Sequence, residues 1–197
     1  MKTTRTYTQR ARADATAETR QRILAAVIAL AEERFTLEIV LADVADRVGV
    51  SVQTVLRHFG SRDGLFDAAR QFRLTTELQE RAAPVGDVPA AVSVIARTYE
   101  NGGDWMLAIL AQEHSDQAAR QVVGRGREVH RNWVCEVFAP QLARSADPDA
   151  LTDLLVVATD LYTWKLLRRD AGLDRTTTEE RMLRLTRALL PADPEEK

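Results

Sequence analysis

The stretch LADVADRVGVSVQTVLRHF, residues 41–59, decides the fold of the N-terminal part of this chain. It predicts two short helices, 41–48 and 52–59, that cross at a three-residue turn. Gly49 permits the positive φ that such a turn requires. Ser51 can cap the second helix by accepting a hydrogen bond from a backbone N–H two or three residues further on. This layout predicts a helix-turn-helix.

The second helix of this motif has one apolar and one polar face. Val55 and Phe59, four residues apart, predict contact with the core. Short polar and basic side chains on the other face can enter a major groove, where Gln pairs with adenine and Arg with guanine. A helical hairpin with a merely solvated face is the alternative interpretation. The candidate DNA-contacting residues in this region are Ser51, Gln53, Thr54, Arg57 and His58.

Charge is distributed unevenly along the 197 residues, although the net charge is only −2. Residues 1–75 carry 12 Lys and Arg against 9 Asp and Glu, whereas residues 76–197 carry 15 against 20. Four basic residues precede the first acid, and Arg5 and Arg10 are our candidates among them for contacts to DNA phosphates. A disordered, solubilising N-terminus explains the same charges.

Nearly the whole chain predicts helix, because Ala, Leu, Arg and Glu dominate and alternating β-branched patterns are almost absent. Thr16 is the expected N-cap of a first helix that ends near residue 35. The expected fold is all-α, with a basic arm (1–15), a three-helix helix-turn-helix domain (16–61) and a C-terminal helical bundle (62–197). The expected helices after the motif cover 62–82, 90–101, 104–114, 116–138, 148–171 and 176–190, with stops or starts at Gly172, Asp147-Pro148 and a Thr177/Glu180 capping box.

The segment RHFGSRDGLF, residues 57–66, resembles the segment that closes the DNA-binding domain of TetR-family transcriptional regulators. The resemblance extends over residues 20–70. It implies that the five polar residues of the motif contact DNA, and that Arg62 occupies the family's basic position at the start of the connecting helix. A helix N-terminus there also favours a phosphate. Phe59 and Leu65 would have structural roles.

Two features depart from the family pattern. Leu56 stands where the family usually has a tyrosine, and Ile39 and Val40 stand where it usually has a pair of threonines. Each lost phosphate contact would weaken binding by about 1 kcal/mol. The leading hypothesis is a ligand-responsive regulator, a repressor that a small-molecule effector releases from a palindromic operator. The alternative is a helical ligand-binding or protein-interaction module with the same fold and weak or lost operator binding.

The C-terminal region would form the homodimer, as the resemblance implies. Its last two long helices are too apolar for one small bundle to bury on one face, and a four-helix interface with a second copy would cover them. The alternative is that both helices are intramolecular core. The residues expected at this interface are Leu155, Leu166, Leu185 and Leu189.

Aromatic and polar side chains in the middle helices predict a cavity for a small, mostly apolar effector, with ordinary core packing as the alternative. Its expected lining is Trp105, Ile109, Gln112, Glu113, His130, Trp133 and Tyr162. No enzyme motif, cofactor site or metal site is expected, since histidines are few and the single cysteine, Cys135, stands alone. One cysteine and no long apolar run predict a cytoplasmic protein.

Overall fold

The computed structural model describes the backbone of residues 3–191, and the side chains of residues 14–191 other than Leu74, Glu77 and Leu78. The elements in this part of the chain are all helical, which confirms the all-α expectation. The chain divides into two compact units, Met1–Glu77 and Leu78–Lys197. The boundary falls inside the fourth helix rather than before it, because the first turns of that helix complete the N-terminal core.

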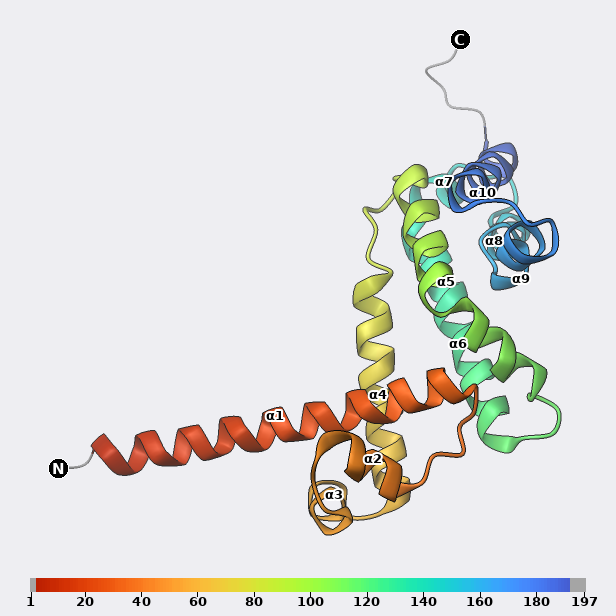
Figure 1. The fold of residues 1–197 in the computed structure, drawn as a ribbon. Coiled ribbons are helices and arrows are strands. Elements are labelled where there is room, and N and C mark those ends of the chain that lie inside the picture. The colour runs from red at the N-terminus through yellow and green to blue at the C-terminus, as the bar shows by residue number, and fades with distance from the viewer. Residues whose placement is uncertain (1–2, 192–197) are drawn as a thin grey trace. The chain divides into compact units, whose positions relative to one another are not determined.

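The first unit contains α1 (Thr3–Arg34), α2 (Leu41–Val48), α3 (Val52–Phe59) and most of α4 (Arg62–Glu80). Figure 1 shows α2 and α3 crossing beneath the C-terminal half of α1. Burial of apolar side chains from all four helices stabilises this arrangement. Its core contains Ile23, Val27, Val44, Val55, Leu65 and Ala69, with Phe66 and Phe72 packed against it.

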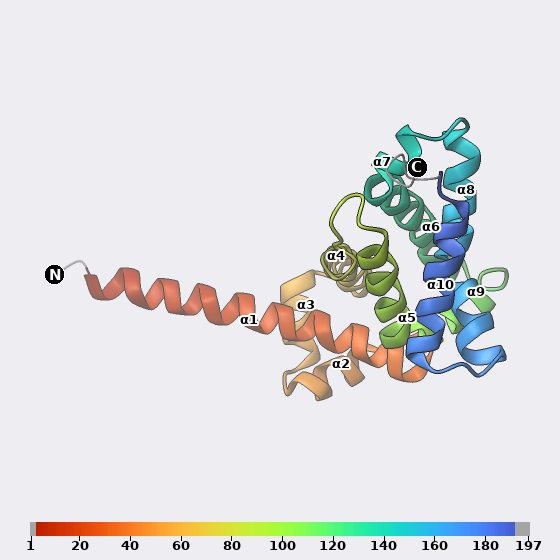
Figure 2. The same ribbon diagram turned by 90° about the horizontal axis from the view of Figure 1, so that it is seen from above.

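The first helix starts earlier than predicted. Thr16 is exposed within α1, which begins at Thr3, so the expected N-cap at Thr16 is wrong. Residues 3–15 contain no Gly or Pro and are rich in helix-forming Ala and Arg, so nothing in them interrupts a helix. The basic segment is therefore an extension of α1, which runs well past α2 and α3 in both views (Figures 1 and 2). The side chains of Arg5 and Arg10 lie outside the described residues.

The second unit is a bundle of longer and shorter helices. Figure 2 shows α10 running beside α5 and α8. A single apolar core joins these helices and includes Ile95, Trp133, Phe138, Leu155, Trp164 and Met182. Its elements are α5 (Val88–Ala111), α6 (Gln117–Val137), α7 (Ala139–Ala143), α8 (Pro148–Ala158), α9 (Leu161–Lys165), the π-turn η1 (Leu166–Asp170) and α10 (Arg175–Leu189).

Helix α5 is continuous where two helices with a break near residues 102–103 were predicted. The reason is packing: a β-carbon at Gly103 would come within 2.6 Å of the Trp164 ring. The glycine thus lets two elements approach closely and does not mark a turn. Gly124 and Gly126 likewise lie within one continuous helix, α6.

The predicted helix 148–171 is broken at Thr159 and Asp160. Tyr99 Oη donates to the Thr159 carbonyl oxygen at 3.0 Å, and the Asp160 carboxylate caps α9 by accepting from the Tyr162 N–H at 2.8 Å. Side-chain partners from α5 and from the break itself therefore satisfy backbone groups that a continuous helix would pair internally. No local sequence signal of the Pro or Gly kind marks this break.

Of the helix-end signals named from the sequence in this unit, two are confirmed and one is wrong. Asp147 caps α8, and Gly172 adopts a φ of 67° after η1, as expected. The expected capping box at Thr177 is wrong, because Asp174 is the N-cap of α10 and accepts from the Thr177 N–H at 2.8 Å. No helix in the described residues is both long and apolar enough to cross a membrane.

Candidate nucleic-acid interface

The turn between α2 and α3 has the predicted geometry. Gly49 has a φ of 74°, and its N–H and that of Val50 donate to carbonyl oxygens of the last turn of α2. Ser51 Oγ accepts from the Thr54 N–H at 3.1 Å and lies 3.0 Å from Thr54 Oγ1. The N-terminal end of α3 is therefore held by its own cap.

Helix α3 presents its polar side chains outward. Val55 is fully buried, while Ser51, Gln53 and Arg57 are exposed and Thr54 and His58 are half-buried. The five predicted contact residues thus lie on a short, capped helix that rests on the core through its opposite face. Such a helix can enter a major groove and present donors and acceptors to base edges.

Arg62 is exposed at the start of α4 and is anchored within its own unit. Its Nη2 donates to the Ile39 carbonyl oxygen at 3.3 Å, and its guanidinium lies 4.5 Å from the centre of the Phe66 ring. Ser61 Oγ accepts from the Gly64 N–H at 3.0 Å and caps the helix. Arg62 therefore has a fixed orientation at a capped helix N-terminus, which suits a phosphate contact.

The apolar departures from the family pattern have different structural roles. Ile39 is fully buried in the core, so the expectation that its position faces phosphate is wrong. Val40 is 55% exposed and is the N-cap of α2 without a side-chain hydrogen bond. Leu56 is half-buried on α3. Only Val40 leaves an exposed apolar surface where a capping hydroxyl would be expected.

Arginines on α1 hold both helices of the motif. Arg20 Nη1 donates to the His58 carbonyl oxygen at 3.2 Å, and Arg22 Nη2 donates to the Val48 carbonyl oxygen at 2.7 Å. Sequence reasoning missed both residues. Their signal is weak: two basic residues that come just before the apolar stripe of a helix.

Ion pairs also tie α2 to α1. The two terminal guanidinium nitrogens of Arg47 donate to the Glu33 carboxylate, at 2.8 and 2.6 Å, and Arg34 pairs with Asp43. The hydrogen bond from Arg47 lowers the pKa of Glu33 below its usual value. Helix α2 is thus tied to α1 near both of its ends, and α3 packs against a fixed α2.

In the second unit, the structure brings together only part of the predicted effector site. The rings of His130 and Trp133 stack with centroids 5.7 Å apart. Trp133 Nε1 donates to the Arg81 carbonyl oxygen at 2.8 Å. Ile109 is buried and Trp105 half-buried, but Tyr162 is 52% exposed. The two polar anchors have other partners: Gln112 donates to the Ala108 carbonyl oxygen, and Glu113 forms a double ion pair with Arg127.

His130 is a neutral, buried group. Its Nε2 lies 3.2 Å from Thr159 Oγ1 and 3.4 Å from the Val156 carbonyl oxygen. Since the Thr159 hydroxyl donates to the Leu155 carbonyl oxygen, both neighbours of Nε2 are acceptors and Nε2 carries the proton. Burial, together with the charge of Arg81, lowers the pKa of His130 to about 4.

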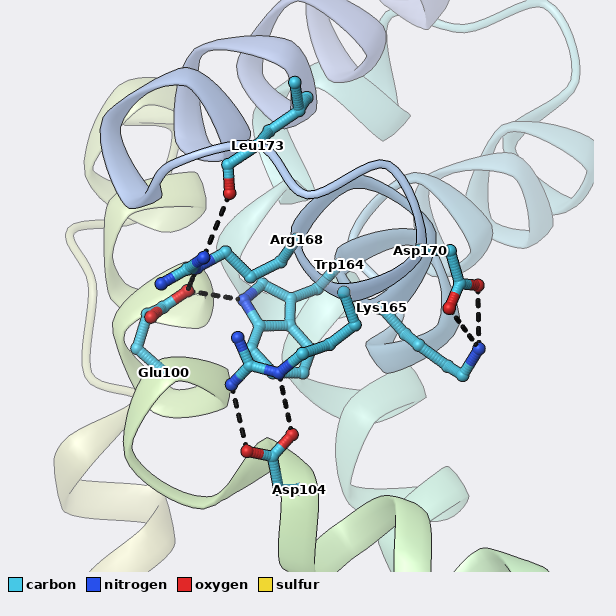
Figure 3. Close-up of polar contacts among 8 residues, drawn as sticks. Glu100, Asp104, Trp164, Lys165, Arg168, Asp170 and Leu173 are labelled. Atoms are coloured by element: carbon cyan, nitrogen blue, oxygen red, sulfur yellow. Dashed lines mark hydrogen bonds and ion pairs between the residues drawn. The ribbon is translucent and has the colours of Figure 1, made fainter.

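Figure 3 shows a polar network that fastens α9 and η1 to α5. Glu100 Oε1 accepts from Trp164 Nε1 and from Arg168 Nε, both at 2.9 Å. Arg169 forms a double hydrogen bond with Asp104, and this contact lowers the pKa of Asp104. No group of three His, Cys, Asp or Glu in the described residues could hold a metal ion.

The residues predicted for a dimer interface fall into two classes. Leu155 is fully buried within its own unit, so its assignment to an interface is wrong; it faces the core because Leu151, Leu155 and Ala158 form the buried side of α8. Leu166 and Leu185 are 60% and 42% exposed, and Leu189 is half-buried. The large apolar side chains exposed on α8, α9, η1 and α10 are Leu154, Val157, Tyr162, Leu166 and Leu185.

Comparison with known proteins agrees with this geometry. Residues 23–69 match the family model described as bacterial regulatory proteins, tetR family. Two solved structures have the same fold at low sequence identity. A TetR-family transcriptional regulator from Rhodococcus sp. is 19% identical, with a TM-score of 0.63 over 87% of this chain and 98% of its own. A transcriptional regulator from Rhodococcus sp. Rha1 is 18% identical, with a TM-score of 0.65 over 89% and 99%. No curated protein matches.

The fold and the capped, outward-facing α3 define a helix-turn-helix protein with a second helical unit. Its helix-turn-helix segment, residues 23–69, is similar to the tetR family of bacterial regulatory proteins, and the chain shares its fold with the two solved structures. The matched family model describes regulatory proteins, and both solved structures are described as transcriptional regulators.

Proposed function

We propose that this protein is a homodimeric repressor that binds a palindromic operator and is released from it by a small-molecule effector. The observation that carries this proposal is α3: a capped helix with a buried apolar face and exposed Gln53 and Arg57. Gln53 and Arg57 lie one turn apart and can address neighbouring base pairs.

The remaining contacts divide into base reading and positioning. Ser51, Thr54 and His58 can reach bases or phosphates from the same helix, while Arg62 meets a phosphate at the start of α4. Arg5 and Arg10, in the basic segment before the motif, are further proposed phosphate contacts. Phosphate contacts set affinity and its salt dependence, and base contacts set sequence preference.

A dimer follows from the need for two reading helices on two half-sites about one DNA turn apart. Exposed apolar side chains on α8, η1 and α10 support the dimer. In the single chain, Val157 and Leu166 are 61% and 60% exposed to solvent. Isologous pairing of these elements in two copies would bury both sets at once.

The effector site is proposed around His130 and Trp133, whose stacked rings lie where α6 meets the break between α8 and α9. Trp105 and Ile109 on α5 are the further apolar candidates. An effector that binds one conformation of this unit better than another shifts the equilibrium toward it. Release follows when that conformation no longer fits the operator spacing.

The test is a fluorescence titration of the purified dimer against labelled DNA from the region flanking its own gene, at low and at physiological salt. We expect binding at least a thousandfold tighter than to random DNA, about the lower end for specific recognition. Equal affinity for both DNAs at every salt concentration would reject the proposal. A thermal-shift screen then identifies ligands, and each ligand found must weaken operator binding.

One observation favours the second candidate function, a module of the same fold without operator binding. Val40, at the N-cap of α2, offers an apolar surface where a hydroxyl could bind phosphate. Under this candidate the protein would still dimerise and bind ligands, but selection from a random DNA pool would enrich no motif. The enriched motif, or its absence, separates the two functions.

A further inference from the structure

The two ends of α3 are held in different ways. At its N-terminal end, Ser51 caps the helix from within the motif. At its C-terminal end, the Gly60 N–H closes the last turn on the Leu56 carbonyl oxygen at 2.7 Å, and Arg20 of α1 supplies the donor to the His58 carbonyl oxygen. The carbonyl groups of a last helical turn lack partners within the helix, so an external donor stabilises that turn.

Arg20 contacts this turn in two ways at once. Besides its hydrogen bond to His58, its guanidinium lies 4.3 Å from the centre of the Phe59 ring. Its positive charge also stands at the C-terminal end of the helix, where the helix dipole favours a cation. The half-buried side chain is thus held by a carbonyl and an aromatic face.

We infer that Arg20 is a positioning residue for DNA reading: it fixes the last turn of α3 and so aims Arg57 and His58. This inference rests on the proposed function. Gln53 and Thr54 lie in the first turn of α3, which Ser51 caps. Their orientation should therefore not depend on Arg20. Loss of Arg20 therefore weakens base discrimination only at the positions that Arg57 and His58 read.

The variant Arg20→Met removes the charge and the donors but keeps an unbranched side chain against Phe59. Arg22→Met is the matched control, because Arg22 lies on the same helix and makes the same kind of bond to the end of α2. Arg20→Lys keeps the charge and a donor. The operator is the sequence selected by the wild-type protein, and each base pair in it is changed in turn.

For Arg20→Met we expect about tenfold weaker operator binding and a less than about twofold change on random DNA, as for loss of one charged hydrogen bond. At the positions where Arg57→Ala no longer discriminates against wrong bases, Arg20→Met should also lose discrimination. At the other positions the affinity penalty for a wrong base should stay as in the wild type. The dependence of affinity on salt should not change, because no phosphate contact is lost. Arg22→Met should keep the wild-type penalty at every position, and Arg20→Lys should restore most of the profile.

Three results would overturn the inference. If operator and random DNA weaken equally and the salt slope falls by about 1, Arg20 is a phosphate contact. If Arg20→Met and Arg22→Met give the same position profile, the effect is general loss of structure. If Arg20→Lys has the circular dichroism spectrum of the folded protein but loses base discrimination at every position, Arg20 affects more than the last turn of α3. Failure of the proposed function looks different, because the wild-type protein would then select no motif at all.

Discussion

The indole ring of Trp164 lies directly against the backbone of Gly103, so that a β-carbon there would come within 2.6 Å of ring atom Cζ3. The ring cannot easily move away. It is fully buried, its Nε1 donates to Glu100, and the Arg169 guanidinium lies 4.6 Å from its centre. This contact joins the middle of α5 to α9.

Replacing Gly103 by alanine should therefore destabilise the protein, although alanine favours helix. We expect a loss of about 1–3 kcal/mol in the free energy of unfolding, the usual cost of overpacking, measured by urea denaturation. Gly124→Ala is the control. Nothing lies within 4 Å of a β-carbon at Gly124, so alanine should stabilise α6 by about 0.5–1 kcal/mol. Equal effects at the two sites would contradict the packing argument.

Replacing Glu100 by leucine should leave Trp164 Nε1 and Arg168 Nε without their shared acceptor. We expect a loss of about 2–3 kcal/mol, because a buried donor is left unpaired and a charged hydrogen bond is removed. Glu100→Gln keeps an acceptor for the indole and should lose less. Urea denaturation of both variants gives the comparison, and equal losses would show that the charge alone matters.

Val157→Glu should convert the proposed dimer to a monomer without unfolding the chain. Val157 is 61% exposed on α8, so a carboxylate there costs the isolated chain little but would be buried in the proposed interface. Val85→Glu is the control, since Val85 is 57% exposed in the loop before α5. Sedimentation equilibrium measures the oligomeric state. If both variants remain dimers, the interface lies elsewhere.

Stability should depend on the protonation of His130. Its pKa is about 4 in the folded chain and 6.5 when unperturbed, so between these pH values the unfolded state binds more protons. Stability should fall by up to about 3 kcal/mol as pH drops through this window. His130→Gln should lack this loss. The free energy of unfolding of the wild type and of His130→Gln is measured as a function of pH, and the two curves are subtracted so that the contributions of the carboxylates cancel. A difference that does not change with pH would refute the lowered pKa of His130.

Arg57→Ala and Arg5→Ala should weaken DNA binding in different ways. Arg57→Ala should cost about 1–3 kcal/mol and relax base preference at one position, because it removes a base contact. Arg5→Ala should leave base preference intact and reduce the salt slope by about 1. Titrations at several salt concentrations with operator and mutated operator measure both quantities. Identical behaviour of the two variants would mean that Arg57 does not read bases.

The helix-turn-helix could be predicted from sequence because its signals are local. Gly49 has the expected positive φ, Ser51 caps α3 as expected, and Val55 lies in the core. Each of these features depends on neighbours a few residues away. The predicted bounds of α2 and α3 agree with the structure for the same reason.

The second unit was harder to predict because distant contacts shape it. Two helices, 90–101 and 104–114, were predicted where α5 is continuous, and the contact of Gly103 with Trp164 lies 61 residues away in the sequence. Asp174 and Thr177 are both residue types favoured at an N-cap, and only the tertiary structure decides that α10 begins after Asp174. Leu155 fits an interface pattern as well as a core pattern, because periodicity does not tell which apolar face meets a second copy.

The candidate DNA site was predicted at the level of α3 but not of its supports. Arg20 and Arg22 act through backbone carbonyl oxygens of other helices, and such contacts leave no residue-type pattern in the sequence. In the second unit the rings of His130 and Trp133 stack, whereas Gln112 and Glu113 have other partners, and the effector site stays a prediction. Aromatic residues on several helices are equally typical of a core and of a cavity, so composition alone could not separate them.

The break between α8 and α9 also limits which residues can change independently in related sequences. Tyr99 and His130 come from two other helices, yet both donate to backbone or side-chain oxygens at Val156–Thr159. A relative that lost one of these donors would leave a buried oxygen unpaired, unless the helix became continuous. Tyr99, His130 and Thr159 should thus be inherited together, and relatives that lack all three should have one unbroken helix from 148 to 170.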